Sequence, residues 1–194
     1  STVDNSLGLR VNLQTVNSDN SYSLLDEVYA SYGAAYSDEV DNIDAIKLEN
    51  TEENLAIVNK HQKLMVERRS KINEGDIIYL TTWNLAQRTY LLEFNPVNLP
   101  SKELTATLVD KYLNTSTPIS TRAISQAYFT ITSDAASASP ERFMVVFSSG
   151  NSQQVLTSKK TIITAYPNPI TDGVIKLQIS NGKKGIYHAE LVNS

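Results

Sequence analysis

The feature that most constrains this chain is an alternation of apolar and polar residues with a period of two, which recurs along its 194 residues. Successive side chains of an extended strand point to opposite faces, so a strand with one buried face produces this pattern. The clearest case is the run of Leu7, Leu9, Val11 and Leu13, which alternates with glycine and polar residues. Helical spacing is scarce, and the sequence predicts an all-β fold.

Further strands are predicted where apolar runs lie between turn-forming residues. Proline cannot donate a hydrogen bond to a sheet, so the strand that begins at Thr89 is expected to end before Pro96, with residues 83–87 as the preceding turn. Eight or more short strands in about 150 residues favour an antiparallel β-sandwich of the immunoglobulin or jelly-roll kind. The predicted strands after the first are residues 63–69, 76–81, 89–94, 104–108, 126–132 and 142–147.

Two segments carry weaker signals for short helices. Residues 23–32 place Leu24, Leu25 and Val28 at helical spacing, and residues 134–142 are rich in alanine and serine. Neither segment is long enough to define an α/β fold. We therefore expect little helix in this chain.

The charge distribution predicts two domains. The net charge of −4 divides into −7 for residues 1–158, with 12 basic and 19 acidic residues, and +3 for residues 159–194, with 5 and 2. We predict a β-sandwich module over residues 1–149, a polar linker over 150–160, and the start of a second small β-sandwich over 161–194, with strands at 161–165 and 174–179. No clustered basic face is present to capture phosphates, which argues against a nucleic-acid partner.

The absence of cysteine excludes disulfides, thiolate metal sites and a cysteine nucleophile. No run of about 18 apolar residues exists to cross a bilayer as a helix, so we expect a soluble chain that does not span a membrane. The first ten residues lack the basic start and apolar stretch of a signal peptide, and we expect that the chain does not begin at a natural precursor start.

The C-terminal segment carries an ordered set of motifs. A Tyr-Pro-Asn-Pro turn is followed by an alternating strand, then by a lysine–glycine–x–tyrosine sequence and a leucine–x–asparagine sequence. This order resembles the type A C-terminal sorting domain of type IX secretion cargo, over residues 161–194. Family domains continue further, so the resemblance implies that only their first half is present and that this sequence alone is not competent for export. The motif residues are Tyr166, Pro167, Asn168, Pro169, Gly173, Lys184, Gly185 and Tyr187.

The longer segment resembles modules that precede such signals in large surface proteins. The resemblance rests on short sequences that include DAIKLE, DIIYL, YLLEFN, YLNTSTP and RFMVVF. It implies a secreted or cell-surface location outside the outer membrane, a role in adhesion or gliding motility, and the type IX secretion machinery as a partner. It implies no chemistry, since the relatives it points to are β-sandwich modules without an assigned activity.

No catalytic residues are predicted. His61 and His188 are far apart in sequence and lie in different predicted domains, and a catalytic base needs an orienting partner. Nothing resembles a nucleophile elbow. Acidic neighbours such as Glu52 and Glu53 point apart on an extended chain, which does not suit a glycosidase.

The acidic segment from Asp26 to Glu53 holds nine carboxylates and one lysine. Calcium prefers such hard oxygen ligands, and Asp38, Asp41 and Asp44 are the candidates. Their spacing does not match the helix–loop–helix pattern, which has a glycine at its sixth position and a glutamate at its twelfth. We expect a solvated acidic loop, with calcium as the alternative and no other cofactor.

Aromatic rings stack on sugar faces, which makes Trp83 a candidate glycan contact because it lies near a predicted turn. Tyr79 and Tyr90 are expected to fill the core from strand interiors. The leading hypothesis is a structural or adhesive module of a larger exported protein. The alternative is a carbohydrate-binding accessory module of a secreted polysaccharide-degrading enzyme.

Overall fold

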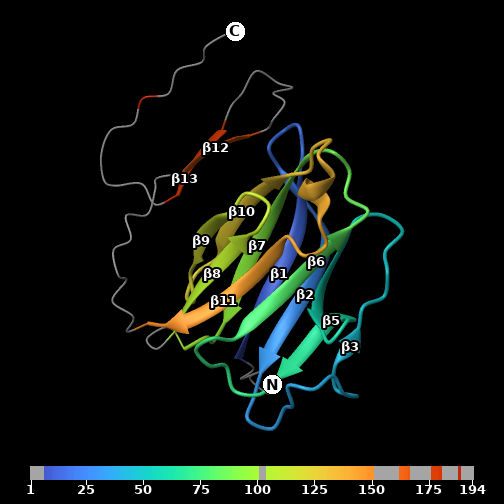
Figure 1. Ribbon diagram of the computed structural model, residues 1–194, viewed down its shortest axis with the longest axis vertical. Helices are drawn as coiled ribbons and strands as arrows, with labels where there is room; N and C mark the ends of the chain where they lie inside the picture. The colour runs from blue at the N-terminus through green and yellow to red at the C-terminus, as the bar shows by residue number, and fades with distance from the viewer. Residues whose placement is uncertain (1–6, 101–103, 151–161, 167–175, 181–187, 189–194) are drawn as a thin grey trace. The chain divides into compact units, whose positions relative to one another are not determined.

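The computed structural model describes residues 7–100, 104–150, 162–166, 176–180 and 188 (Figure 1). They belong to two compact units, Ser1–Gln153 and Gln154–Ser194, which we call the first and second unit. The sequence predicts a linker over residues 150–160, between a first module that ends at 149 and a second that begins at 161. Residues 151–161 lie outside the described residues. Among the described residues there is no helix long and apolar enough to cross a membrane.

The prediction of an all-β chain is confirmed in the described residues, where the one helix is the 3-10 turn η1 (Ala135–Ala138). Most predicted strands are present, with ends that differ by a few residues. The strands of the first unit are β1 (Leu7–Val16), β2 (Tyr22–Tyr32), β3 (Ala45–Ile46), β4 (Asn54–Asn59), β5 (Gln62–Arg69), β6 (Ile77–Trp83), β7 (Thr89–Val97), β8 (Leu104–Asp110), β9 (Thr115–Ile119), β10 (Ser125–Thr130) and β11 (Phe143–Ser149).

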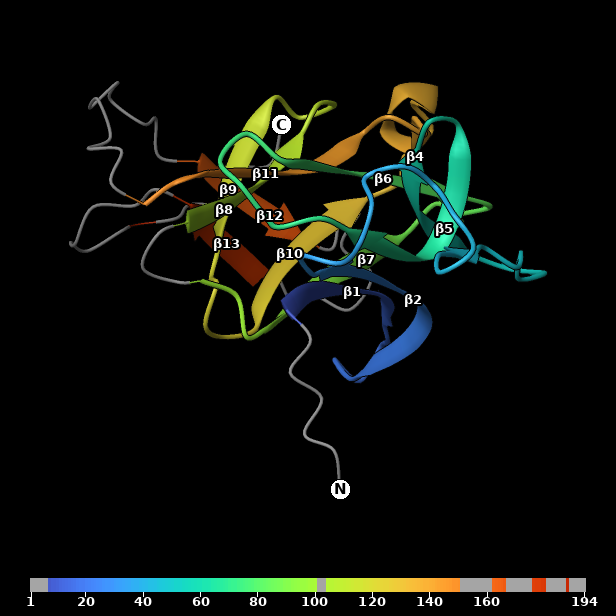
Figure 2. The same ribbon diagram turned by 90° about the horizontal axis from the view of Figure 1, so that it is seen from below.

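These strands form a single, nearly closed sheet with the order β10-β7-β1-β2-β5-β4-β6-β11-β8-β9. Figure 2 shows β10, β7, β1 and β2 on one side, β4, β6 and β11 facing them, and β5 between the two groups. Nearly all pairs are antiparallel, but β2 and β5 run parallel, from Tyr29 opposite Val66 to Tyr32 opposite Arg69. The first half of β5 pairs with β4 instead. Strand β5 therefore connects the two groups of strands.

The core lies between the two groups and is built by the alternation that the sequence predicts. In β1, Leu9, Val11 and Leu13 are fully buried, while Arg10 and Asn12 are only partly covered. Aromatic rings complete the core, with Tyr90 stacked on Phe129 at 5.5 Å between ring centroids. Gly8 has a steric role, because a Cβ there would lie 2.5 Å from the Tyr29 ring.

The weak helix signal over residues 23–32 is wrong, because these residues belong to β2. Asp26, Val28 and Ala30 are buried at a period of two and pair with β1. The pairing shifts by one residue where Leu13 faces Asp26 and Gln14 faces Leu24. This β-bulge leaves Leu25 without a paired residue in β1, between the paired Leu24 and Asp26. The extra residue interrupts the alternation, and the apolar residues of β2 then have the spacing of a helix.

The predicted end of a strand before Pro96 is also wrong, since β7 continues to Val97. Strand β10 pairs with β7 only as far as Phe94, whereas β1 continues alongside to Val97. In the described part of the chain, Pro96 therefore has a partner strand on one side only, and such a position tolerates the missing N–H. The weak helix signal over 134–142 corresponds only to the four residues of η1.

The second unit contains β12 (Ile162–Tyr166) and β13 (Lys176–Ser180), which pair antiparallel from Ile162 opposite Ser180 to Tyr166 opposite Lys176. Both strands were predicted, within two residues at each end. Leu177 and Ile179 alternate with Gln178 and are exposed at 44% and 39%.

Candidate functional site

Charged side chains are buried at several places in the first unit, and each has an oppositely charged partner. Burial of an unpaired charge is strongly unfavourable, so a buried charge needs a partner close to it. Such pairs therefore mark the positions where charged groups hold parts of the fold together. We call this set the buried charges and treat it as the candidate site. Its members among the described residues are Asp26, Lys47, Glu53, Glu67, Asp110 and Arg142.

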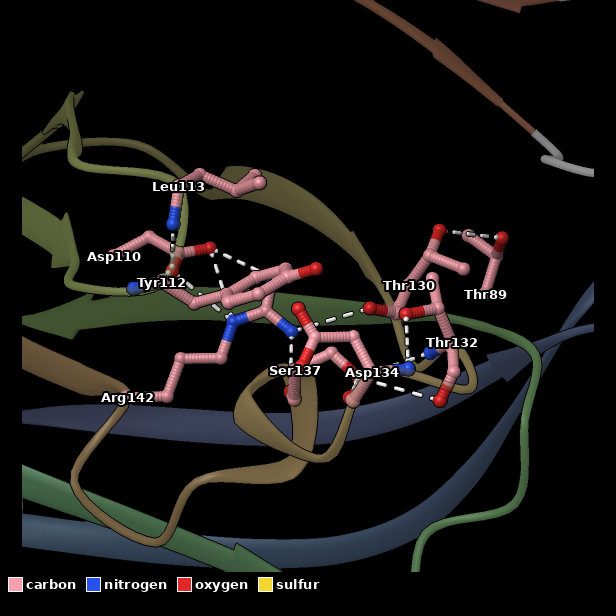
Figure 3. A network of polar contacts seen from close by, with 9 residues as sticks. All are labelled: Thr89, Asp110, Tyr112, Leu113, Thr130, Thr132, Asp134, Ser137 and Arg142. Atoms are coloured by element: carbon pink, nitrogen blue, oxygen red, sulfur yellow. Dashed lines mark hydrogen bonds and ion pairs between the residues drawn. The ribbon is translucent and has the colours of Figure 1, made fainter.

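Arg142 forms the densest of these contacts (Figure 3). It precedes β11 directly and has only 2% of its surface exposed. Its Nε donates to Asp110 Oδ1 at 3.0 Å, and its Nη2 donates to Asp110 Oδ2 at 2.8 Å. Its Nη1 donates to the carbonyl oxygens of Thr130 and Ser137 at 3.1 and 2.6 Å. The guanidinium thus forms a two-point ion pair and also binds two backbone carbonyls.

Aromatic rings surround the same guanidinium. Its central carbon lies 4.8 Å from the ring centroid of Tyr112, 5.2 Å from Phe129 and 4.8 Å from Phe143. A cation over aromatic faces is attracted by their quadrupoles, most strongly where water is excluded. These rings stabilise the charge that burial has removed from water.

Asp110 and Ser137 extend the network into the neighbouring turns. Asp110 Oδ1 accepts the N–H groups of Tyr112 and Leu113 in the β8–β9 turn, at 3.0 and 3.1 Å. Ser137 Oγ accepts the N–H of Thr132 at 3.0 Å, which fixes η1 to the end of β10. The arrangement joins β8, β10, η1 and β11, and its hydrogen bonds are directed into the fold.

Lys47 and Asp26 form a second buried pair, with 2.5 Å between Nζ and Oδ1 and side chains 2% and 7% exposed. Asp26 Oδ2 also accepts the backbone N–H of Leu55 at 2.7 Å, and Oδ1 accepts that of Glu27. The pair therefore fixes the segment after β3 and the start of β4 to β2.

Glu53 pairs with Arg88 and accepts a hydrogen bond from the Tyr90 hydroxyl at 3.2 Å. Burial acts to raise the pKa of Glu53, but backbone hydrogen bonding and Arg88 outweigh it and hold the pKa below its usual value. The same hydroxyl accepts the N–H of Ala86 at 2.7 Å. This cluster fixes the turn between β6 and β7.

Glu67 is the buried carboxylate with the weakest compensation. It accepts a hydrogen bond from Asn59 Nδ2 at 2.7 Å, and Arg69 Nε lies 3.6 Å from its Oε1. Burial raises the pKa of Glu67 and outweighs the attraction of Arg69, with the nearby Asp44 and Asp38 adding to the rise. Glu67 is thus held in a place that disfavours its charged form.

The three calcium candidates accept hydrogen bonds from backbone N–H groups of the same fold. Asp38 accepts the N–H and the hydroxyl of Ser70, and these hydrogen bonds lower the pKa of Asp38. Asp44 accepts the N–H groups of Arg68 and Asp41, and Asp41 accepts that of Ile43. Within the described parts of the chain, no three His, Cys, Asp or Glu side chains gather as a metal site. The three carboxylates attach the loop between β2 and β3 to the end of β5.

Trp83, the candidate glycan contact, is the last residue of β6 and is partly buried. The Lys63 ammonium lies 3.8 Å from its ring centroid, over a ring face that a sugar would need. Tyr90 is fully buried, as predicted, but the expectation that Tyr79 fills the core is wrong. Tyr79 is 47% exposed, because the inward positions of β6 belong to Ile78 and Leu80.

The two histidines belong to different units. His61 is exposed in the two-residue β4–β5 turn, where Lys60 and His61 both have positive φ, as a type I′ hairpin turn requires. His188 is exposed in the second unit. Of the sorting-domain motif, Tyr166 ends β12, while Pro167, Asn168, Pro169, Gly173, Lys184, Gly185 and Tyr187 lie outside the described residues.

The sequence reasoning missed the buried charges. The sequence pattern places Arg142 only at the start of an apolar strand, and nothing in that pattern singles out Asp110. One signal was available for Asp110 and Arg142, since each lies between an apolar strand and a turn, where a buried pair can fix the turn. The partner could not be predicted, because Asp110 and Arg142 are 32 positions apart.

Comparisons with known proteins return no match: no family model, no curated protein and no solved structure is similar to this chain.

Proposed function

We propose that this chain is a non-catalytic structural or adhesive module of a larger protein that is secreted or held at the cell surface. The observation that carries the proposal is the use of the buried charges. Each of the six binds a partner from the same fold, and together they fix turns and loops to the sheet. In this proposal the buried charges stabilise the fold, which suits a structural module.

The finer architecture in this proposal is a β-sandwich. The proposed sandwich would divide the single sheet at β5, with β10, β7, β1 and β2 as one layer and β4, β6, β11, β8 and β9 as the other. The second unit is proposed as the first part of a type IX sorting domain, supported by its motif order and by the hairpin of β12 and β13. Its partner is then the type IX secretion machinery.

A domain exchange in the native host tests both parts. In the larger exported protein, residues 7–150 are replaced by an unrelated β-module of similar size, and in a second strain Tyr166, Pro167 and Pro169 are changed to alanine. We expect surface display to survive the exchange and to fail with the motif variant. Loss of display in the first strain together with full display in the second would contradict the proposal.

The carbohydrate-binding alternative has less support, because Lys63 covers one face of the Trp83 ring. A glycan array probed with the whole chain separates the two functions. The proposal expects no saturable binding that depends on Trp83. Saturable binding to one glycan class that is abolished in Trp83→Ala would favour the alternative.

A further inference from the structure

Strand β3 occupies an unusual position at the border of the first unit (Figure 1). Leu64 of β5 pairs with Ile57 of β4 and with Ile46 of β3, and Val66 pairs with Tyr29 of β2 and with Ala45. A strand has two edges, so β2 and β4 share one edge of β5 and β3 lies on the other. Among the described residues β3 pairs with no strand except β5, which leaves its outer edge open.

The open edge carries large apolar side chains. Lys47 points inward to Asp26, so its neighbours Ile46 and Leu48 point outward, and they are 53% and 78% exposed. Ile43, two residues before β3, and Met65, in the neighbouring strand β5, are each 38% exposed. Edge strands are usually protected from pairing with another chain by lysine, proline or a covering element. Exposed aliphatic side chains give no such protection and favour pairing. We call Ile43, Ile46, Leu48 and Met65 the apolar edge.

The segment that carries the apolar edge is mainly acidic, and one cation of β5, Arg68, donates from its guanidinium to the carbonyl oxygen of Ile43. Residues 37–52 contain six carboxylates and one lysine, and that lysine is neutralised by Asp26. Lys60 and Lys63 pair with Glu39 and Glu49, through side chains that are 45% to 70% exposed. Exposed pairs of this kind contribute little and exchange readily with another cation. A segment that covers this edge is therefore favoured if it carries positive charge.

We propose that the open edge of β3 binds an extended, basic segment of a partner protein by strand addition. Main-chain hydrogen bonds would join the segment to β3, its apolar side chains would cover Ile46 and Leu48, and its lysines or arginines would lie near Glu39, Asp41 and Glu49. This inference goes beyond the structural role proposed above and does not depend on it.

Peptide binding to the whole chain tests the inference. The probe is a fluorescein-labelled nine-residue peptide of alternating lysine and valine, followed by fluorescence anisotropy at 50 mM NaCl. We expect saturable binding that weakens at least about fivefold at 300 mM NaCl, because the attraction is screened. A peptide of alternating glutamate and valine is expected not to bind. Absence of binding by the lysine–valine peptide, or equal binding of both peptides, would overturn the inference.

Two changes locate the site and its mode of binding. The double variant Ile46→Lys, Leu48→Lys is expected to weaken binding at least about tenfold, whereas Ile124→Lys, at a similarly exposed position elsewhere, is expected to change it less than about twofold. A lysine–valine peptide with a central proline is expected to lose binding, since proline cannot donate to a ladder. Binding that survives either the double variant or the proline would contradict strand addition at β3.

Discussion

The turns around Arg142 and the acidic segment of residues 37–52 both depend on charged side chains, yet they use charge in different ways. Arg142 and Asp110 are buried and bind each other at two points, together with backbone groups of the neighbouring turns. Most of the acidic segment is exposed, and pairs such as Lys60 with Glu39 lie in solvent. The acidic segment holds more charge. Removal of one partner from the buried pair leaves the other charge buried and unpaired, so we expect the buried pair to have the larger effect on stability.

The largest expected effect therefore comes from Arg142. Its replacement in Arg142→Met leaves Asp110 buried without its counter-charge, and we expect the free energy of unfolding to fall by about 3–5 kcal/mol. Urea denaturation followed by tryptophan fluorescence measures the change.

The matched control is Arg122→Met, which makes the same substitution at an exposed position. It is expected to change the free energy of unfolding by less than about 0.5 kcal/mol. Similar effects of the two variants would show that burial does not distinguish the two regions.

Lys47 lies between the two extremes, because it belongs to the acidic segment but is buried. We expect Lys47→Met to lower the free energy of unfolding by about 2–4 kcal/mol. The loss is smaller than at Arg142 because Lys47 Nζ donates to Asp26, whereas removal of Arg142 also leaves the carbonyl oxygens of Thr130 and Ser137 without that donor. Lys111→Met, at an exposed lysine, serves as the control in the same denaturation series. A result for Lys47→Met as small as for this control would place Lys47 with the surface charges.

Glu67 is expected to produce a pH effect. Its pKa in the folded chain is raised, so its contribution to stability is complete below the unfolded pKa of about 4.3 and is lost as the pH rises through the folded pKa. Removal of this carboxylate in Glu67→Gln should make the stability of the variant rise more between pH 4 and pH 7 than that of the parent.

Denaturation at three pH values across this range measures the two slopes. Carboxylates with lowered pKa values, such as Asp38 and Glu53, are common to both proteins and cancel in the difference. Glu74→Gln, at an exposed glutamate, is the control and should follow the parent. Parallel curves for Glu67→Gln and the parent would mean that burial of Glu67 does not control its protonation.

The smallest effect is expected at the surface. Glu39 pairs with Lys60 through exposed side chains, and Glu39→Gln should change the free energy of unfolding by less than about 0.5 kcal/mol. Thermal unfolding of the variant and the parent at low and high salt is sufficient to test it. A loss of more than about 1 kcal/mol would show that the acidic segment stabilises the fold through its charges.

Alternation was enough to predict the class of fold and most strands, because one buried face imposes the period of two on each strand by itself. It failed where the cause lies in a neighbouring strand. The bulge opposite Leu13 and Gln14 hid β2, and the early end of β10 allowed β7 to continue through Pro96. The path of the sheet through β5, with a parallel pair on part of one edge, has no signature in any single strand.

The candidate site was less predictable than the fold. A buried ion pair joins residues that are distant in sequence, and Asp26 and Arg142 look like ordinary surface charges when read along the chain. The residue type of Trp83 and its place near a predicted turn make it a candidate, but neither indicates that Lys63 from another strand covers its ring. Contacts between residues distant in sequence decide which charges are buried. The local pattern of a single sequence does not predict these contacts.

A double-mutant cycle on Arg142 and Asp110 tests most directly whether the buried pair acts as one unit. The cycle compares Arg142→Met, Asp110→Leu and the double variant by urea denaturation, and it isolates the coupling between the two side chains. We expect each single change to destabilise strongly and the double variant to lose at least about 2 kcal/mol less than the sum, because no unpaired charge remains buried. Losses that add within about 0.5 kcal/mol would contradict the pairing on which the structural role of this module rests.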